Sequence, residues 1–215
     1  MRTHFLIALC LLAGCATVEG ASAPPLTAPA PAASAPFDVA VDLPGGSYHL
    51  DPRHASVLFR IRHEGLAYFT ARFDTKDATL ELDAADPSRS QLDATVDANS
   101  VNTGLVNARG ERSFDQSIAR ALGGAQIRFV STAIERTGAH TAHVNGDLTL
   151  NGQTHPAALD VTFAGGAVDP LRGGAEVIGF SAQGEIDRTQ WGVDEWRAFT
   201  DARVQIVIEA ELVRS

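Results

Sequence analysis

The sequence predicts an all-β domain that follows an unstructured leader. Three observations support this prediction. Apolar and polar residues alternate along most of the chain, as they do in strands with one buried face. Short Gly-, Asn- and Pro-containing turn signals separate these runs. Helical spacing of apolar residues is confined to one short stretch. Regularly spaced strands without long helical insertions indicate a closed antiparallel barrel or a sandwich.

Length and charge limit the possible functions. The 215 residues fit one domain with appendages, and the hydrophobic content of 45% is ordinary for a globular protein. Lys and Arg number 17 against 26 Asp and Glu, which gives a formal net charge of −9. A nucleic-acid partner is not expected, because phosphate binding needs a basic face.

The first 14 residues are expected to be an export signal. Arg2 supplies a positive charge, and the apolar run from Phe5 to Ala13 is too short to span a bilayer as a helix. Leu-Ala-Gly-Cys at residues 12–15 resembles the bacterial lipobox, in which the signal is cut before the cysteine and the cysteine is acylated. Cys15 is therefore the expected lipid-attachment residue. The alternative is an ordinary secretory signal with a chance cysteine.

This resemblance also predicts where the protein is located. The protein would be lipid-anchored in the bacterial cell envelope and would face the periplasm. The outer membrane is favoured, because Ala16 stands where inner-membrane retention usually requires Asp. Cys10 lies in the segment to be removed, so no disulfide is expected in the mature chain.

Residues 15–46 are expected to form a disordered tether that begins at the lipidated cysteine. Ala, Pro, Ser and Thr dominate this stretch, with Ala-Pro-Pro at 23–25 and Pro-Ala-Pro at 29–31. Such a composition favours an extended chain without a packed core. The barrel domain is therefore expected to occupy residues 47–215.

Alternation identifies the strands of this domain. In the first run Val57, Phe59 and Ile61 share one face, whereas Arg60 and Arg62 take the other. The later runs repeat the pattern at Leu80 and Leu82; Leu92, Ala94 and Val96; Ile127 and Phe129; Val144, Leu148 and Leu150; Leu159, Val161 and Phe163; Phe180 and Ala182; and Val204, Ile206, Ile208 and Leu212.

Turns are expected at Glu64-Gly65, Ala85-Asp86-Pro87, Asn151-Gly152, Gly165-Gly166 and Gly173-Gly174. Asn151-Gly152 is the strongest signal, because both central positions of a type I′ hairpin turn need positive φ.

A short amphipathic helix is expected between Ser113 and Gly123. Apolar residues recur there at helical spacing, and Ser113 with Gln116 would form a capping box. Gly123-Gly124 would end the helix. In an all-β domain such a helix commonly covers one open end of a barrel.

Several segments, in order, resemble the YceI-like family of periplasmic lipid-binding proteins. Residues 48–65 contain a Leu-Asp pair, a histidine, an aromatic strand and a second histidine near a glycine. Residues 146–156 place Leu-Thr before the Asn-Gly turn. Residues 179–192 end in Ile-Asp-Arg-Thr-Gln-Trp-Gly, and residues 100–104 add a shorter match. Residues 109–125, which include the expected helix, depart from the family pattern.

The resemblance spans about residues 48–213 and implies a lipocalin-like antiparallel β-barrel of about eight strands. It also implies an elongated apolar cavity that holds isoprenoid or fatty-acyl chains. Periodicity alone does not distinguish such a cavity from a packed core. The candidate ligand-binding residues are Phe59, Ile61, His63, Phe73, Phe129, Leu148, Leu150, Phe180, Ile186, Arg188 and Trp191.

Two of these candidates are polar. His63 shares parity with Phe59 and Ile61, so its imidazole is expected to face inward, where it could hydrogen-bond a ligand headgroup. The alternative is a structural histidine satisfied by backbone at the strand end. Arg188 is expected at the barrel rim, where it could pair with an anionic headgroup. Asp194 or Glu195 would be its alternative partner.

No catalytic or metal site and no cofactor are expected. Residues 179–184 miss the Gly-x-Ser-x-Gly pattern of hydrolases by one residue and lack the helix that follows it. His140 and His143 are three apart on a strand, so they point to opposite faces and are expected to face solvent.

The function expected is binding, storage or transport of an isoprenoid or fatty-acyl amphiphile by a membrane-anchored barrel, without enzymatic activity. Two alternatives remain open. The barrel could be filled and serve as an envelope protein-interaction module, with a redox partner that handles isoprenoid quinones. An enzyme acting on the bound lipid is the other.

Overall fold

A computed structural model of the chain describes residues 44–215. The expected export signal, Cys15 and nearly all of the expected tether lie outside the described residues. Within them, no helix is long and apolar enough to cross a membrane.

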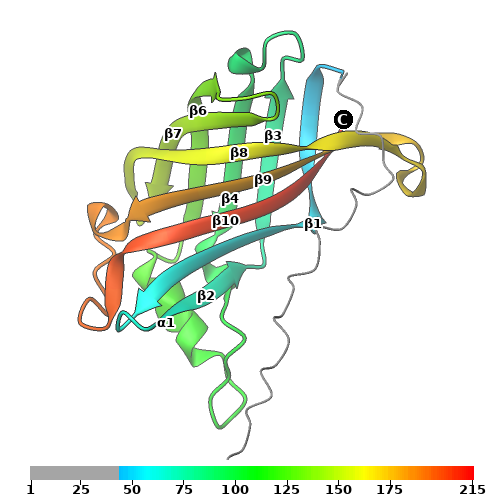
Figure 1. Ribbon diagram of the computed structural model, residues 1–215. Helices are drawn as coiled ribbons and strands as arrows, with labels where there is room; N and C mark the ends of the chain where they lie inside the picture. Colours follow the sequence, from blue (N-terminus) through cyan, green and yellow to red (C-terminus); the bar gives the residue numbers. More distant parts are fainter. Residues whose placement is uncertain (1–43) are drawn as a thin grey trace, which may run out of the picture. The chain divides into compact units, whose positions relative to one another are not determined.

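Within residues 44–215, ten strands and one α-helix follow one another (Figure 1). They are β1 (Gly46–His63), β2 (Ala67–Phe73), β3 (Lys76–Leu82), β4 (Gln91–Asp97), β5 (Val101–Asn102), α1 (Ser113–Ala121), β6 (Gln126–Arg136), β7 (Thr141–Leu150), β8 (Gln153–Asp169), β9 (Ala175–Asp187) and β10 (Thr200–Arg214). Short 3-10 turns lie between several of them.

The strands close into an antiparallel barrel with eight strand positions. The sheet runs in the order β10-β9-β8-β7-β6-β4-β3-β1, and β10 pairs back onto β1. β2 and β3 together occupy one of these positions, because the C-terminal part of β1 pairs with β2 and its first residues pair with β3. β5 pairs only with the end of β2. The pairing of β10 with β1 closes the sheet, and it confirms the predicted barrel over a sandwich.

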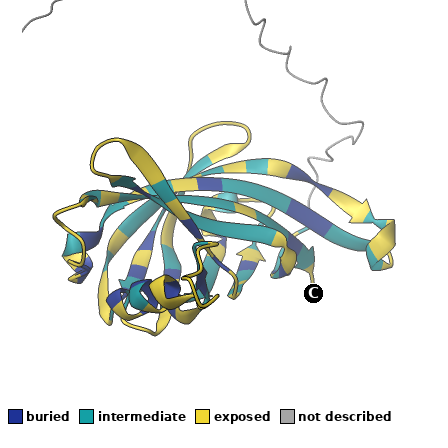
Figure 2. Cartoon of the chain, turned by 90° about the horizontal axis from the view of Figure 1, so that it is seen from below, coloured by how far each residue is buried: buried dark blue, intermediate teal, exposed yellow. Residues whose placement is uncertain are grey.

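Side-chain alternation gives the barrel an apolar interior. Buried and exposed residues alternate along the strands (Figure 2). The buried apolar residues form three clusters, one of which gathers Phe129, Val144, Leu148, Leu159 and Trp191. The predicted inward positions are therefore the ones that face the interior.

The hairpin turns follow from backbone conformation. Asn151 and Gly152 have φ of 50° and 71°, as a type I′ turn requires, and Glu64 and Gly65 have the same pair of values. The expected turn at Gly165-Gly166 is wrong. Both glycines lie within β8, where the pairing with β9 shifts register next to Gly165. A glycine pair inside a long strand marks a bulge here instead of a turn.

β1 carries an outward bulge at residues 51–54, which stand against Glu211 alone on β10. Asp51 is buried in this bulge. Its carboxylate accepts a hydrogen bond from His54 at 2.8 Å and lies 3.0 Å from the guanidinium of Arg172. The hydrogen bond from His54, helped by Arg172 and by the amide of Arg53, lowers the pKa of Asp51 to about 2. These contacts hold the bulge to the β8–β9 connection.

The predicted helix is present, but one of its caps differs from the prediction. Arg112 is the N-cap residue and Ser113 is already helical, so no capping box forms. The N-terminal end of α1 is held by Asp115 instead, whose carboxylate accepts from the amide and hydroxyl of Thr103 and from Arg112. The C-terminal end has the predicted glycine stop. The amide of Gly124 donates to Ala119 in a Schellman motif.

Candidate ligand cavity

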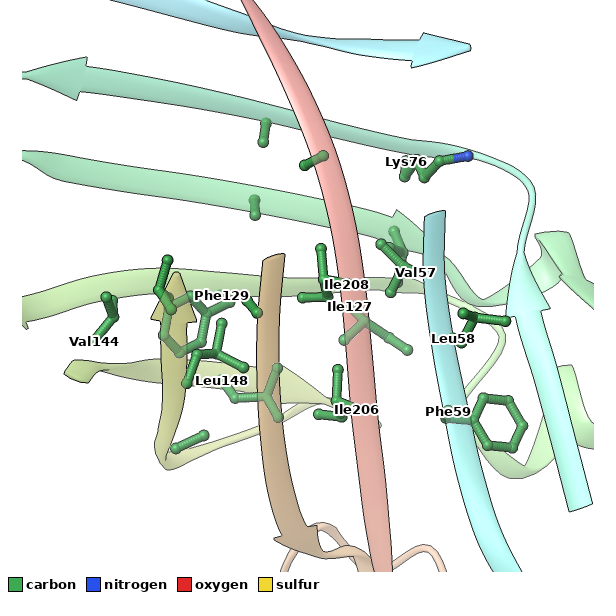
Figure 3. A pocket seen from close by; sticks show the side chains of 18 of the residues that line it. Val57, Leu58, Phe59, Lys76, Ile127, Phe129, Val144, Leu148, Ile206 and Ile208 are labelled. Carbon is green, nitrogen blue, oxygen red and sulfur yellow. The ribbon is translucent and has the colours of Figure 1, made fainter. Parts of the chain in front are cut away.

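An apolar cavity of about 830 Å³ occupies the barrel interior. Every strand of the barrel and α1 contribute to its lining, and most of the lining side chains are aliphatic or aromatic. Figure 3 shows side chains of β1, β6, β7 and β10 directed toward the space between the strands. The interior is therefore hollow, which periodicity alone did not establish.

The apolar candidates line this cavity, with one exception. The lining includes Phe59, Ile61, Phe73, Phe129, Leu148, Leu150, Phe180 and Ile186. Strand parity selected these residues, and closure of the sheet turns the selected face inward.

Trp191 is the exception. Its side chain is 1% exposed, yet it lies outside the cavity lining. The indole Nε1 donates to the carbonyl of Leu148 at 3.0 Å, and the ring packs within the cluster that contains Phe129 and Leu159. Trp191 follows β9 on a 3-10 turn, where strand parity no longer applies, and its side chain belongs to the core cluster without lining the cavity.

Arg188 lines the end of the cavity but does not offer its charge to a ligand. Its side chain is 5% exposed. The guanidinium donates to the carbonyls of Val193, Glu195 and Asp201 and to the hydroxyl of Thr200. Burial lowers the pKa of Arg188 below its ordinary value. The alternative ion pair with the carboxylate of Asp194 or Glu195 does not form, because the guanidinium donates to backbone carbonyls and one hydroxyl instead.

The histidines lie at the rims. His63 borders the cavity at the end of β1, but its side chain is about half exposed, and its nearest charged group is Glu64 at 3.9 Å. His140 is exposed and borders the opposite end, where its ring stacks on Phe163 with centroids 6.2 Å apart. His143 lies on the outer surface and pairs with Asp160 at 2.8 Å. In residues 44–215, no three His, Cys, Asp or Glu side chains form a metal-binding group.

Aromatic side chains crowd the end of the cavity beside α1. Phe69 lies 6.5 Å from Phe59 and 5.8 Å from Phe114, and Phe114 contacts Trp196 at 5.8 Å, measured between ring centroids. Phe114 and Trp196 are each more than one-third exposed. The sequence did not identify Phe69, Phe114 and Trp196 as cavity residues. Phe69 lies on the short strand β2, Phe114 on α1 and Trp196 in the connection before β10.

Lys76 is a further cavity residue that was not identified from the sequence. It lines the cavity, and Leu80 and Leu82 lie at the same parity on β3. The signal was present in the alternation, which places Lys76 on the apolar face of its strand.

Comparison with known proteins agrees with this architecture. A YceI-like domain model matches residues 48–212. Protein YceI of Salmonella arizonae is 31% identical over 165 residues, which cover 75% of this chain and 83% of the relative. BcnA of Burkholderia cenocepacia shares the fold, with a TM-score of 0.64 and 21% identity over 75% of this chain and 98% of BcnA.

A polyisoprenoid-binding domain of Saccharophagus degradans also shares the fold. Its TM-score is 0.53, with 14% identity over 78% of this chain and 98% of that domain. Residues 48–212 cover the entire barrel apart from its terminal residues. The chain therefore belongs to the YceI-like family.

Proposed function

We propose that this protein binds an isoprenoid or fatty-acyl amphiphile inside its barrel and serves as a lipid carrier or reservoir. The observation that carries the proposal is the apolar cavity of about 830 Å³. Small-molecule sites typically measure about 300–1,000 Å³ and combine apolar walls with a few polar groups. The polyisoprenoid-binding domain of Saccharophagus degradans, which has this fold, adds support.

Apolar burial is sufficient for retention. Each buried methylene contributes about 0.8 kcal/mol, so a chain of a dozen or more carbons is held without covalent chemistry. The proposed role is binding and not catalysis. A protein-interaction module with a filled barrel would not need this cavity, which favours the carrier.

The proposal includes attachment to a membrane. The lipobox-like sequence before Cys15 supports export, acylation and a position in the cell envelope, with the outer membrane favoured. Acyl chains on Cys15 would keep the carrier next to a source of amphiphiles.

The ligand can be tested by extraction of purified protein with organic solvent, followed by mass spectrometry. We expect a long-chain lipid at close to one molecule per protein. Repeated absence of such a lipid, across several expression hosts, would contradict the proposal.

A matched pair of variants separates cavity binding from surface binding. Ala94 lines the cavity, in register with Phe129 on β6, whereas Ala133 on the same β6 strand is exposed. Ala94→Phe should fill the cavity and lower the extracted lipid at least several-fold, and Ala133→Phe should leave it unchanged. Equal lipid content in both variants would place the lipid outside the barrel.

A further inference from the structure

Lys76 places a primary amine on the cavity wall, whose lining is mostly apolar but includes Asp77 and Thr95 nearby. It is the only lysine in the sequence. Its register neighbour on β4 is Val96, whose neighbour on β6 is Ile127, and all three side chains line the cavity. Lysine is rarely placed at inward positions, because its charge must be solvated or paired.

The fold supplies no carboxylate for this amine. Within residues 44–215 no Asp or Glu lies within ion-pair distance of Lys76. Its Nζ donates only to the carbonyl of Asp74, at 3.3 Å. The carboxylate of Asp74 is engaged by Arg72 and Asn102, each at 2.7 Å. Asp77 is exposed and also lines the cavity, but its carboxylate accepts from the amide of Ala78 and forms no ion pair with Lys76. Lys76 thus keeps donors for another partner.

The barrel wall is unpaired beside Lys76. β1 pairs with β3 through residues 46–49 and with β2 through residues 58–63, so residues 50–57 have no partner on this edge. The cavity is lined from both sides of this break, by Ala55, Val57 and Leu58 on β1 and by Lys76 and Ala78 on β3. Figure 3 shows Lys76 on the same side of the cavity as Val57 and Leu58.

We propose that Lys76 binds the acidic headgroup of the amphiphile, a carboxylate or a phosphate ester, at this break in the wall. The apolar tail would lie in the cavity, and the headgroup would contact both the ammonium and water. A hydrogen bond between an ammonium and an anion is roughly twice as strong as a neutral one. This inference rests on the proposed function and adds the chemical class of the headgroup.

The inference is tested by binding measurements with acid and alcohol pairs of equal chain length. The probes are palmitate with hexadecanol, and geranylgeranyl phosphate with geranylgeraniol. Delipidated wild-type protein should bind at least one acid more tightly than its alcohol, by roughly tenfold or more. The two pairs distinguish a fatty-acyl carboxylate from an isoprenoid phosphate.

Variants assign the preference to one side chain. Lys76→Met should abolish the preference for the acid while alcohol binding is unchanged, and Lys76→Arg should largely retain it. Arg136→Met is the matched control, because Arg136 borders the cavity at the end of β6. A preference that survives in Lys76→Met, or that is lost in Arg136→Met instead, would overturn the inference.

The alcohols separate this inference from the proposed function. If acid and alcohol bind equally well to wild-type protein, the cavity binds lipids but the role of Lys76 is wrong. If neither acid nor alcohol binds, the proposed function itself fails.

A spectroscopic test uses the single lysine. Reductive ¹³C-methylation labels Lys76 and the amino terminus, which can be told apart with Lys76→Met. Titration with the acid should shift the Lys76 methyl signal, and the alcohol should shift it much less. Equal shifts with both ligands would contradict contact with the headgroup.

Discussion

Arg188 shows how neighbouring backbone can determine the role of a charged residue. Its guanidinium donates to two carbonyls of the connection between β9 and β10, those of Val193 and Glu195, and to the carbonyl of Asp201 and the hydroxyl of Thr200 at the start of β10. Arg188 therefore organises the loop that borders one end of the cavity, including Glu195, Trp196 and Phe199.

We expect Arg188→Met to destabilise the fold by about 3 kcal/mol, because it leaves buried carbonyls without donors. The measurement is the free energy of unfolding in urea. Arg197→Met is the control, since Arg197 is exposed and pairs with Asp194 at 3.2 Å, an interaction worth at most about 1 kcal/mol. Similar losses in both variants would show that the buried contacts of Arg188 contribute little.

At the scale of elements, hydrogen bonds define both ends of α1. Asp115 ties its first turn to Thr103, and the Schellman motif ends it at Gly123 and Gly124. Its inner face places Ile118 and Ala121 on the cavity lining. The position of the helix thus determines how far that end of the cavity is covered.

Gly123, which follows the C-cap of α1, is a position where substitution should be poorly tolerated. It has φ of 89°, and a Cβ there would lie 2.9 Å from Cα of Asn151 in the β7–β8 turn. Gly152, with φ of 71°, has open space around it. Both alanine variants should lose about 1–2 kcal/mol from backbone strain. Gly123→Ala should lose at least about 1 kcal/mol more, because backbone must move.

Urea unfolding of the two alanine variants measures this difference. Equal destabilisation would mean that α1 and the β7–β8 turn can separate without cost. The comparison therefore reports how rigidly the helix is held against the barrel.

At the scale of the whole molecule, closure of the sheet creates the cavity. The inward faces of the strands provide enough apolar side chains to line the barrel, and a volume of about 830 Å³ remains between them. An acidic exterior accompanies this apolar interior, with a formal net charge of −9 for the chain. Such a charge favours solubility of the barrel.

The proposed attachment to a membrane is independent of the barrel and has its own prediction. Cys15→Ser should move the protein from the membrane fraction to the soluble fraction on cell fractionation, because no acyl chains can be added. Cys10→Ser should leave the protein membrane-bound, since Cys10 lies in the segment that the lipobox interpretation expects to be removed. Membrane association of Cys15→Ser equal to that of the unaltered chain would contradict the lipobox interpretation.

Much of the fold could be predicted because strand parity is a local property. Alternation identified Phe59, Ile61, Phe129 and Phe180 as inward positions, and each lines the cavity. The Asn151-Gly152 turn and the glycine stop of α1 could also be predicted locally, since glycine adopts positive φ without steric cost. The same reasoning misread Gly165-Gly166, because a bulge and a turn both use glycine.

The sequence by itself thus determined an all-β chain, its inward faces and one short helix, because short-range alternation and backbone preference encode them. Tertiary structure decided that the barrel is hollow, that Trp191 packs outside the cavity and that backbone carbonyls engage Arg188. It also decided that Lys76 borders a break between β1 and β3. These features depend on contacts between residues far apart in the chain, which form only when the sheet closes.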